Sequence, residues 1–85
     1  MDEFSTTESR TVLLFSRPGC HLCDVARQRI LAARARVPFR FEEVMVDCSE
    51  DLEREYGVRV PVVVVDGREE FEFEVDPDRL ARLLA

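Results

Sequence analysis

Lysine and tryptophan are absent from this 85-residue chain, and glycine and cysteine occur only three times each. No segment approaches the roughly 18 apolar residues that a membrane-spanning helix needs, so we expect no membrane span. The chain also lacks the basic start and apolar stretch of a secretory signal peptide, which predicts a cytoplasmic protein. All twelve basic residues are arginine, a bias to which we attach no mechanism.

Acidic residues outnumber basic ones by eighteen to twelve, which gives a formal net charge of -6. A surface of that sign repels phosphate backbones and anionic lipid head groups, so we expect neither nucleic acid nor membrane partners. With 46% hydrophobic residues in so short a chain, we expect one small core. Residues 1–10 are polar and without periodicity, which predicts a mobile tail before a single domain at residues 11–85.

The apolar residues alternate between strand-like and helix-like spacing along the domain. The pattern predicts a strand at residues 11–15, a helix at 20–34, a strand at 39–47, a short helix at 49–56, a strand at 61–65, a strand at 70–75 and a terminal helix from Asp76. Glu42 and Glu43 break the alternation of the second strand, which indicates a bulge there. Residues 61–65 are apolar throughout, as in a strand buried on both faces, so helices are expected on both sides of the sheet.

The last two strands are expected to form a hairpin, because Asp66-Gly67 is among the strongest hairpin turns. Beyond it, Phe71, Phe73 and Val75 alternate with glutamates, which predicts an edge strand with one buried and one charged face. A parallel pair from the first half can join this hairpin in one sheet. The sequence therefore predicts an α/β fold with a four-stranded mixed sheet and the order βαβαββα.

Cys20 and Cys23 form a Cys-x-x-Cys sequence between the first strand and the first helix. Pro18 and Gly19 end the strand, so Cys20 falls at the helix start, where unpaired backbone N–H groups and the helix dipole favour thiolate over thiol. The i, i+3 spacing puts Cys23 on the same helix face, near disulfide reach. In a cytoplasmic protein, such an isolated pair is more often catalytic or metal-binding than structural.

Four other side chains each have two interpretations. His21, when protonated, stabilises a neighbouring thiolate by its charge, or it is simply an exposed residue of the first helical turn. Arg17 and Arg59 supply positive charge to a bound substrate, or they are ordinary solvated charges. Cys48 is expected to pack as a small apolar side chain at the end of the second strand, with a regulatory thiol as the alternative.

The element order, with Cys20-His21-Leu22-Cys23 after the first strand and Val60-Pro61 before the third, resembles the glutaredoxin branch of the thioredoxin fold. Residues 18–24 and 56–61 look like those of a family of small bacterial glutaredoxin-like proteins, and the match covers about residues 11–84. The resemblance implies a thiol-disulfide oxidoreductase with Cys20 as nucleophile, Cys23 as resolving cysteine and Pro61 as a cis-proline facing the disulfide. A cis-proline there would leave the backbone of Val60 free to pair with an extended substrate.

The chain departs from ordinary glutaredoxins after the last strand, where those proteins carry a Gly-Gly pair that helps to hold glutathione. Residues 71–76 contain no glycine, and the carboxylates nearby suit an anionic thiol poorly. We therefore expect weak glutathione binding. The expected partner is a disulfide-containing protein or another low-molecular-weight thiol, and the enzyme is expected to be a monomer without a cofactor.

Two further hypotheses belong to other classes of protein. In the first, the domain is a redox-inactive binding module that holds an extended peptide along Val60-Pro61. In the second, two subunits share a metal or an iron–sulfur cluster through Cys20. Three cysteines and one histidine offer a single chain no convincing tetrahedral zinc set, so we expect no metal site within one chain.

Overall fold

The computed structural model describes residues 10–85. Its elements are β1 (Thr11–Ser16), α2 (His21–Arg34), β2 (Arg40–Met45), the 3-10 helix η1 (Val46–Cys48), α3 (Glu50–Tyr56), β3 (Val62–Val65), β4 (Arg68–Glu72) and α4 (Pro77–Leu84). Residues 1–9 of the expected tail lie outside the described residues. Arg10, at the end of that range, forms an ion pair with Asp66 at 2.9 Å.

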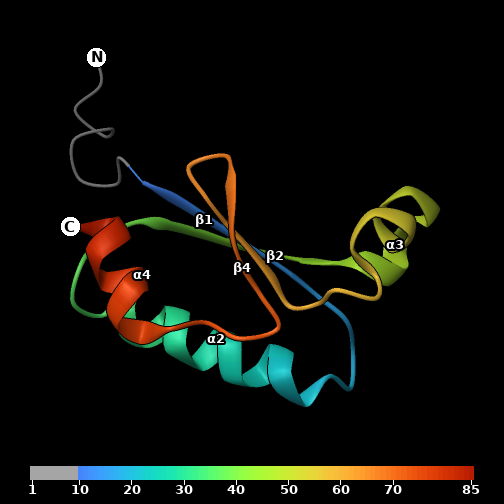
Figure 1. The fold of residues 1–85 in the computed structure, drawn as a ribbon, viewed down its shortest axis with the longest axis horizontal. Coiled ribbons are helices and arrows are strands. Elements are labelled where there is room, and N and C mark those ends of the chain that lie inside the picture. The colour runs from blue at the N-terminus through green and yellow to red at the C-terminus, as the bar shows by residue number, and fades with distance from the viewer. Residues whose placement is uncertain (1–9) are drawn as a thin grey trace.

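The strands form one mixed sheet in the order β2-β1-β3-β4. β1 runs parallel to β2 and antiparallel to β3, and β3 and β4 form the antiparallel hairpin. In Figure 1, α2 and α4 lie together along the sheet, whereas α3 lies apart from them at one end. The predicted α/β fold, with a four-stranded mixed sheet and helices on both faces, is confirmed.

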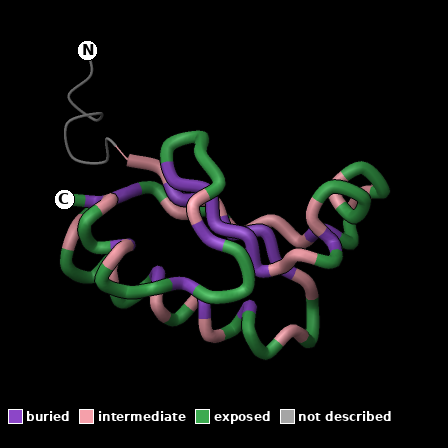
Figure 2. Tube along the Cα trace, in the orientation of Figure 1, coloured by how far each residue is buried: buried purple, intermediate pink, exposed green. Residues whose placement is uncertain are grey.

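The two faces of the sheet bury different residues, because successive side chains of a strand point to opposite sides. The larger cluster, toward α2 and α4, includes Val12, Leu14, Ile30, Phe39, Val63, Phe71, Leu80 and Leu84. The smaller one, toward α3, contains Phe15, Val46, Val62 and Val64. Here Tyr56 of α3 stacks on Phe15 with ring centroids 4.1 Å apart. Figure 2 shows the buried residues concentrated along the central strands.

The second strand differs from its prediction in one respect. The pairing of β1 with β2 runs without interruption from Thr11 opposite Arg40 to Ser16 opposite Met45, so Glu42 and Glu43 cause no bulge. Glu43 is accommodated because it faces α2, where Arg27 binds its carboxylate at 2.5 Å. The register shifts instead between β3 and β4. Val63 pairs with Phe71 and Val64 with Glu69, so Glu70 has no partner residue in β3.

The prediction of a regular strand as far as Val75 is wrong. β4 ends at Glu72, and Phe73 has a φ of +67° and an exposed fraction of 47%. The Phe73 N–H still donates to the carbonyl of Pro61 at 2.8 Å, but the chain then turns, because the Glu74 N–H donates to the carbonyl of Glu72 at 2.6 Å in a γ-turn around Phe73. Val75 is buried as expected, but from the loop that leads to α4. β4 nevertheless lies at the sheet edge, as predicted.

The hairpin between β3 and β4 turns at Asp66 and Gly67, whose φ values of +51° and +86° suit the tight turn that Asp-Gly favours. The Asp66 carboxylate accepts a hydrogen bond from the Thr11 N–H at 2.9 Å and pairs with Arg10. These two interactions hold the pKa of Asp66 below its ordinary value. The turn is thereby tied to the first residue of β1.

Candidate functional site

The two paired cysteines lie where the local backbone changes from strand to helix. Gly19 has a φ of +75°, a conformation that a residue with a side chain rarely adopts, and it brings the chain from β1 into α2. Cys20 is the N-cap of α2, with extended backbone, and its Sγ accepts the N–H of Cys23 at 3.1 Å. The expectation that Cys20 falls at the helix start is therefore met. An N–H directed at this sulfur stabilises a thiolate more than a thiol.

The sulfurs of Cys20 and Cys23 are joined in a disulfide, with their Cα atoms 5.2 Å apart. The two cysteines differ in exposure, because Cys20 is half-buried whereas Cys23 is completely buried. Of the two residues, only Cys20 is exposed in part to an incoming reagent. His21, which follows Cys20 and was a candidate to stabilise its thiolate, is exposed in the first turn of α2.

The loop before β3 reaches the same end of the sheet as the cysteines, since Phe15 of β1 pairs with Val62. The Val60–Pro61 peptide bond is cis, and Pro61 is buried. Within residues 10–85, neither the N–H nor the C=O of Val60 takes part in a backbone hydrogen bond. The structure thus leaves an unpaired stretch of backbone at Val60, beside the turn that carries Cys20.

Arg17, which the sequence offered as a cation for the substrate, is already bound by groups of the protein. Its Nη2 donates to the carboxylate of Glu53 at 2.5 Å and to the carbonyl of Gly57 at 2.8 Å. These contacts tie the turn before Cys20 to α3. The sequence could not reveal them, because the partners lie 36 and 40 residues away.

Arg59 is engaged even more fully. Its Nη1 contacts Glu69 at 3.0 Å and Glu72 at 2.5 Å, and its Nη2 donates to the carbonyl of Glu55 at 3.1 Å. The hydrogen bonds to Glu69 and then Glu72 hold the pKa of Arg59 above its ordinary value. A substrate carboxylate would have to displace glutamates of β4 to reach this guanidinium.

Three exposed apolar side chains lie on the segments that carry the cysteine pair and flank the Val60–Pro61 bond. Leu22 lies inside the Cys-x-x-Cys sequence, Val58 precedes the Val60–Pro61 bond, and Phe73 follows β4 and is hydrogen-bonded to Pro61 through its backbone. Their exposed fractions are 47%, 90% and 47%. We call Leu22, Val58 and Phe73 the apolar rim. Sequence reasoning missed it, because Phe73 fitted the inward phase of a strand.

A part-buried polar network lies where α2 packs on the sheet. Ser16 is completely buried, and its hydroxyl donates to Glu43 at 2.6 Å. Arg27 donates to both carboxylate oxygens of Glu43, and it also pairs with Asp24 at 2.8 Å. Hydrogen bonds from Arg27, and then from Ser16, hold the pKa of Glu43 below its ordinary value despite partial burial. No local pattern in the sequence indicates this network, because Ser16, Arg27 and Glu43 lie on three different elements.

Cys48 differs from its prediction, because it is exposed in η1 instead of packed at the end of a strand. The chain leaves β2 at Met45 and turns through a 3-10 helix, so Val46 takes the buried position. In the part of the chain that the structure describes, no three side chains of His, Cys, Asp or Glu gather closely enough to hold a metal ion. No helix between residues 10 and 85 is long and apolar enough to cross a membrane.

The sheet topology and the position of the cysteine pair define a class of protein, the thioredoxin-like fold with a Cys-x-x-Cys pair at disulfide distance. Within that class, the chain belongs to the glutaredoxin-like domain family (DUF836), whose model matches residues 11–85. This confirms the resemblance seen in the motifs.

Solved structures and curated relatives agree with this assignment. The X-ray structure of XcR50 from X. campestris is 39% identical, covers 86% of this chain and 93% of its own, and superposes with a TM-score of 0.71. Ne2328 from Nitrosomonas europaea is 28% identical over 89% of this chain and 92% of its own, with a TM-score of 0.77. The uncharacterized protein Rv0508 of Mycobacterium tuberculosis is 34% identical, over 81% of this chain and 76% of its own. Oxidised mitochondrial thioredoxin 3 from Saccharomyces cerevisiae, at 23% identity and a TM-score of 0.67 over 91% of this chain and 77% of its own, shares the fold.

Proposed function

We propose that the protein is a thiol-disulfide oxidoreductase in which Cys20 is the nucleophile and Cys23 resolves the mixed disulfide. The observation that carries this proposal is the unequal exposure of a bonded pair at a helix N-terminus. Cys20 accepts an N–H and is only half-buried, whereas Cys23 is completely buried beside it. Such a position favours the thiolate of the reduced cysteine over its thiol, and the thiolate is the nucleophile in thiol-disulfide exchange.

In the reductive direction, the Cys20 thiolate attacks one sulfur of a substrate disulfide, and the other substrate sulfur leaves as a thiolate. The protein is then joined to the substrate through Cys20. The Cys23 thiol loses its proton and attacks the Cys20 sulfur, which forms the Cys20–Cys23 disulfide and releases the second substrate thiolate. Two electrons have passed from the protein to the substrate, and an external thiol must supply two more to reduce the pair again.

The surroundings of Cys20 favour a disulfide-containing protein or a weakly charged small disulfide as substrate. The apolar rim offers surface that contact with a partner would cover. The free backbone of Val60 offers hydrogen bonds to an extended segment. Arg17 and Arg59 are already paired with glutamates, so an anionic thiol such as glutathione gains little from them. We propose that the enzyme acts in the cytoplasm as a monomer and uses no cofactor besides its own cysteines.

The experiment that tests this function is a redox titration of the purified protein in defined thiol-disulfide buffers, with trapped thiols counted by mass spectrometry. The expected result is a reversible two-electron transition of Cys20 and Cys23 between about -180 and -270 mV, the range of known exchange catalysts. The Cys48→Ser variant removes the third thiol from the count and should give the same midpoint. A pair that shows no transition there would support a binding module or a shared metal site instead.

Glutathione binding is tested on the Cys23→Ser variant, which has the nucleophile but cannot release a bound thiol through the second cysteine. We expect its mixed disulfide with glutathione to form without tight, saturable non-covalent binding of reduced glutathione. Calorimetric titration of the reduced variant with glutathione measures that binding directly. Tight, saturable binding of glutathione in this titration would overturn the proposed substrate preference, but it would leave the proposed oxidoreductase activity in place.

A further inference from the structure

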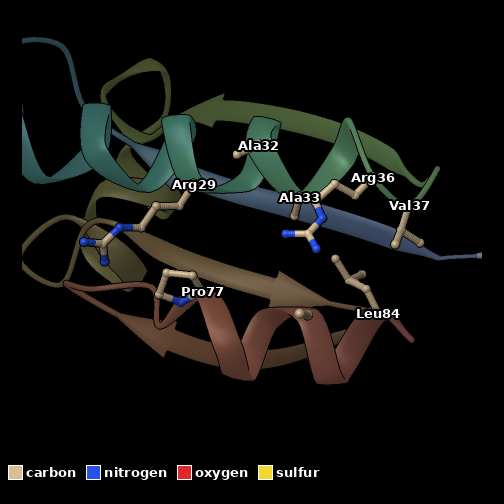
Figure 3. A pocket seen from close by; sticks show the side chains of 8 residues that line it. Arg29, Ala32, Ala33, Arg36, Val37, Pro77 and Leu84 are labelled. Carbon is tan, nitrogen blue, oxygen red and sulfur yellow. The ribbon is translucent and has the colours of Figure 1, made fainter.

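A concave site lies between α2 and α4, away from the cysteines. It is lined by Arg29, Ala32, Ala33, Arg36, Val37, Pro77, Ala81 and Leu84, and its volume is about 340 Å³. Figure 3 shows the two helices as its walls, with Ala33 and Arg36 directed from α2 and its following turn toward Leu84 of α4. Ala33 follows Cys23 by ten residues, which is about 15 Å along the helix at 1.5 Å per residue. We call this site the α2–α4 groove.

The lining of the α2–α4 groove combines only two kinds of side chain. Apart from its two arginines, every lining residue is an alanine, a valine, a leucine or a proline. The groove therefore has no hydroxyl, amide or carboxylate side chain to bind a sugar or the edge of a nucleobase, and no aromatic ring to stack on one. An aliphatic body is the ligand that such walls accept.

The two arginines give the groove its charge preference. Among the described residues, the Arg36 guanidinium has no carboxylate or carbonyl partner, and Figure 3 shows it between the two helices near Ala33. Arg29 lies toward the Pro77 end, where its Nη1 donates to the carbonyl of Val75 at 2.6 Å. A free guanidinium beside an apolar wall binds a carboxylate in a two-pronged arrangement. Arg36 is therefore available to a ligand, whereas several other arginines of the chain are bound to carboxylates.

The volume of the α2–α4 groove limits the length of an aliphatic anion. At the roughly 30 Å³ that a water-sized group occupies in a liquid, 340 Å³ holds about eleven non-hydrogen atoms. Octanoate has about that many, whereas the long chains of membrane lipids would extend well beyond the groove. We propose that the α2–α4 groove binds a free, medium-chain aliphatic carboxylate, with its chain along Ala33, Ala81 and Leu84 and its carboxylate on Arg36.

The test is a titration of the full chain, in its oxidised form, with sodium octanoate, followed by carbon–proton NMR of the alanine methyl groups. We expect saturable shifts at Ala32, Ala33 and Ala81. Replacing octanoate by butanoate should weaken binding at least tenfold, since each fully buried methylene contributes about fourfold in affinity. Octanol, which has the same chain without the charge, should bind at least about fivefold more weakly, because a charge-assisted hydrogen bond is lost.

Two variants and a matched control separate this proposal from nonspecific binding. Arg36→Gln removes the free guanidinium and should weaken octanoate binding by about fivefold or more. Ala81→Leu fills the groove from an exposed helical position and should abolish the shifts without unfolding the chain. Arg82→Gln changes the net charge equally on the exposed side of α4 and should bind octanoate as the parent does.

Three results would overturn the proposal. They are shifts that never saturate, shifts that gather around the cysteines instead of the groove, and equal affinities of Arg36→Gln and Arg82→Gln for octanoate. The midpoint of the Cys20–Cys23 couple is expected to be unchanged in Arg36→Gln. A loss of groove binding therefore leaves the oxidoreductase proposal standing, and a failed redox titration leaves this one standing.

Discussion

Cys20 and Cys23 lie one helical turn apart but in unlike surroundings, and this contrast decides how each is expected to react. After reduction, we expect iodoacetamide at pH 7 to modify Cys20 at least about tenfold faster than Cys23, because the first sulfur is accessible and its thiolate is stabilised by an N–H. Quenched mass spectrometry of peptides gives both rates. Cys48 serves as the internal standard for an exposed thiol in the same chain. A faster reaction at Cys23 than at Cys20 would contradict the assigned roles.

Phe73 is the residue at which the backbone departs from sequence expectation, since it holds a left-handed φ of +67°. That conformation costs a residue with a side chain about 1 to 2 kcal/mol and costs glycine almost nothing. We therefore expect Phe73→Gly to be more stable than Phe73→Ala by about 1 kcal/mol in urea unfolding, the reverse of the usual order. Both variants lose a side chain of the apolar rim, so both should reduce a protein disulfide more slowly than the parent. Equal stabilities of the two would show that the left-handed conformation is not held in solution.

At the scale of single elements, one side chain of α4 binds β4 at its register shift. Glu70 has no partner residue in β3, and Arg79 donates instead to its carbonyl at 2.7 Å and to its carboxylate at 2.6 Å. The Arg79 guanidinium also lies over the ring of Phe71. We expect Arg79→Met to lower the free energy of unfolding by about 1 to 2 kcal/mol, because a part-buried carbonyl loses its partner. Arg82→Met, on the same helix but exposed, should change it by less than about 0.5 kcal/mol. Urea titrations of the two variants make the comparison, and similar losses in both would contradict it.

The contact of α2 with β2 predicts how stability depends on pH. The pKa of Glu43 is lowered in the folded state, chiefly by Arg27, so its contribution to stability is present above the unfolded pKa and is lost as the pH falls through the folded one. Glu43→Gln keeps the shape and an acceptor for Ser16 but not the charge. We expect it to cost about 1 to 2 kcal/mol at pH 7, and less as the pH falls below roughly 4. Urea unfolding of both proteins at several pH values measures the difference, and a cost that does not shrink in acid would refute this reading.

The element order and the position of the cysteines could be predicted because they depend on local signals. Apolar spacing marks β1 and α2, Gly19 marks the turn between them, and Asp66-Gly67 marks the hairpin. The contacts that shape the surroundings of Cys20 are not local. Arg17 pairs with Glu53, and Arg59 pairs with Glu69 and Glu72. The Phe73 N–H donates to Pro61, and the fold brings all of these partners together from different segments. Spacing along the chain does not indicate such partners, which is why Arg17 and Arg59 were expected to be available to a substrate and Phe73 was expected to be buried.

At the scale of the whole molecule, the charge of -6 acts on small substrates before any contact is made. We expect glutathione disulfide, which is anionic, to be reduced more slowly than neutral hydroxyethyl disulfide at low ionic strength. Raising the salt from about 10 to 200 mM should narrow the gap, because the screening length falls from about 30 Å to below 10 Å. Stopped-flow measurement of single-turnover oxidation of the reduced protein gives both rates. If the difference between the two rates does not change with salt, the preference comes from direct contacts with the substrate and not from the electrostatic field of the protein.

The stacking of Tyr56 on Phe15 makes the molecule its own optical reporter. Because the chain has no tryptophan and a single tyrosine, all of its intrinsic emission above that of phenylalanine comes from one ring. That ring lies on the α3 face of the sheet, and the Arg59 guanidinium is 5.4 Å from its centre. Tyr56 also precedes the Val60–Pro61 bond by only a few residues. Movement of this loop when a partner docks, or separation of α3 from the sheet, would change the tyrosine signal without any label.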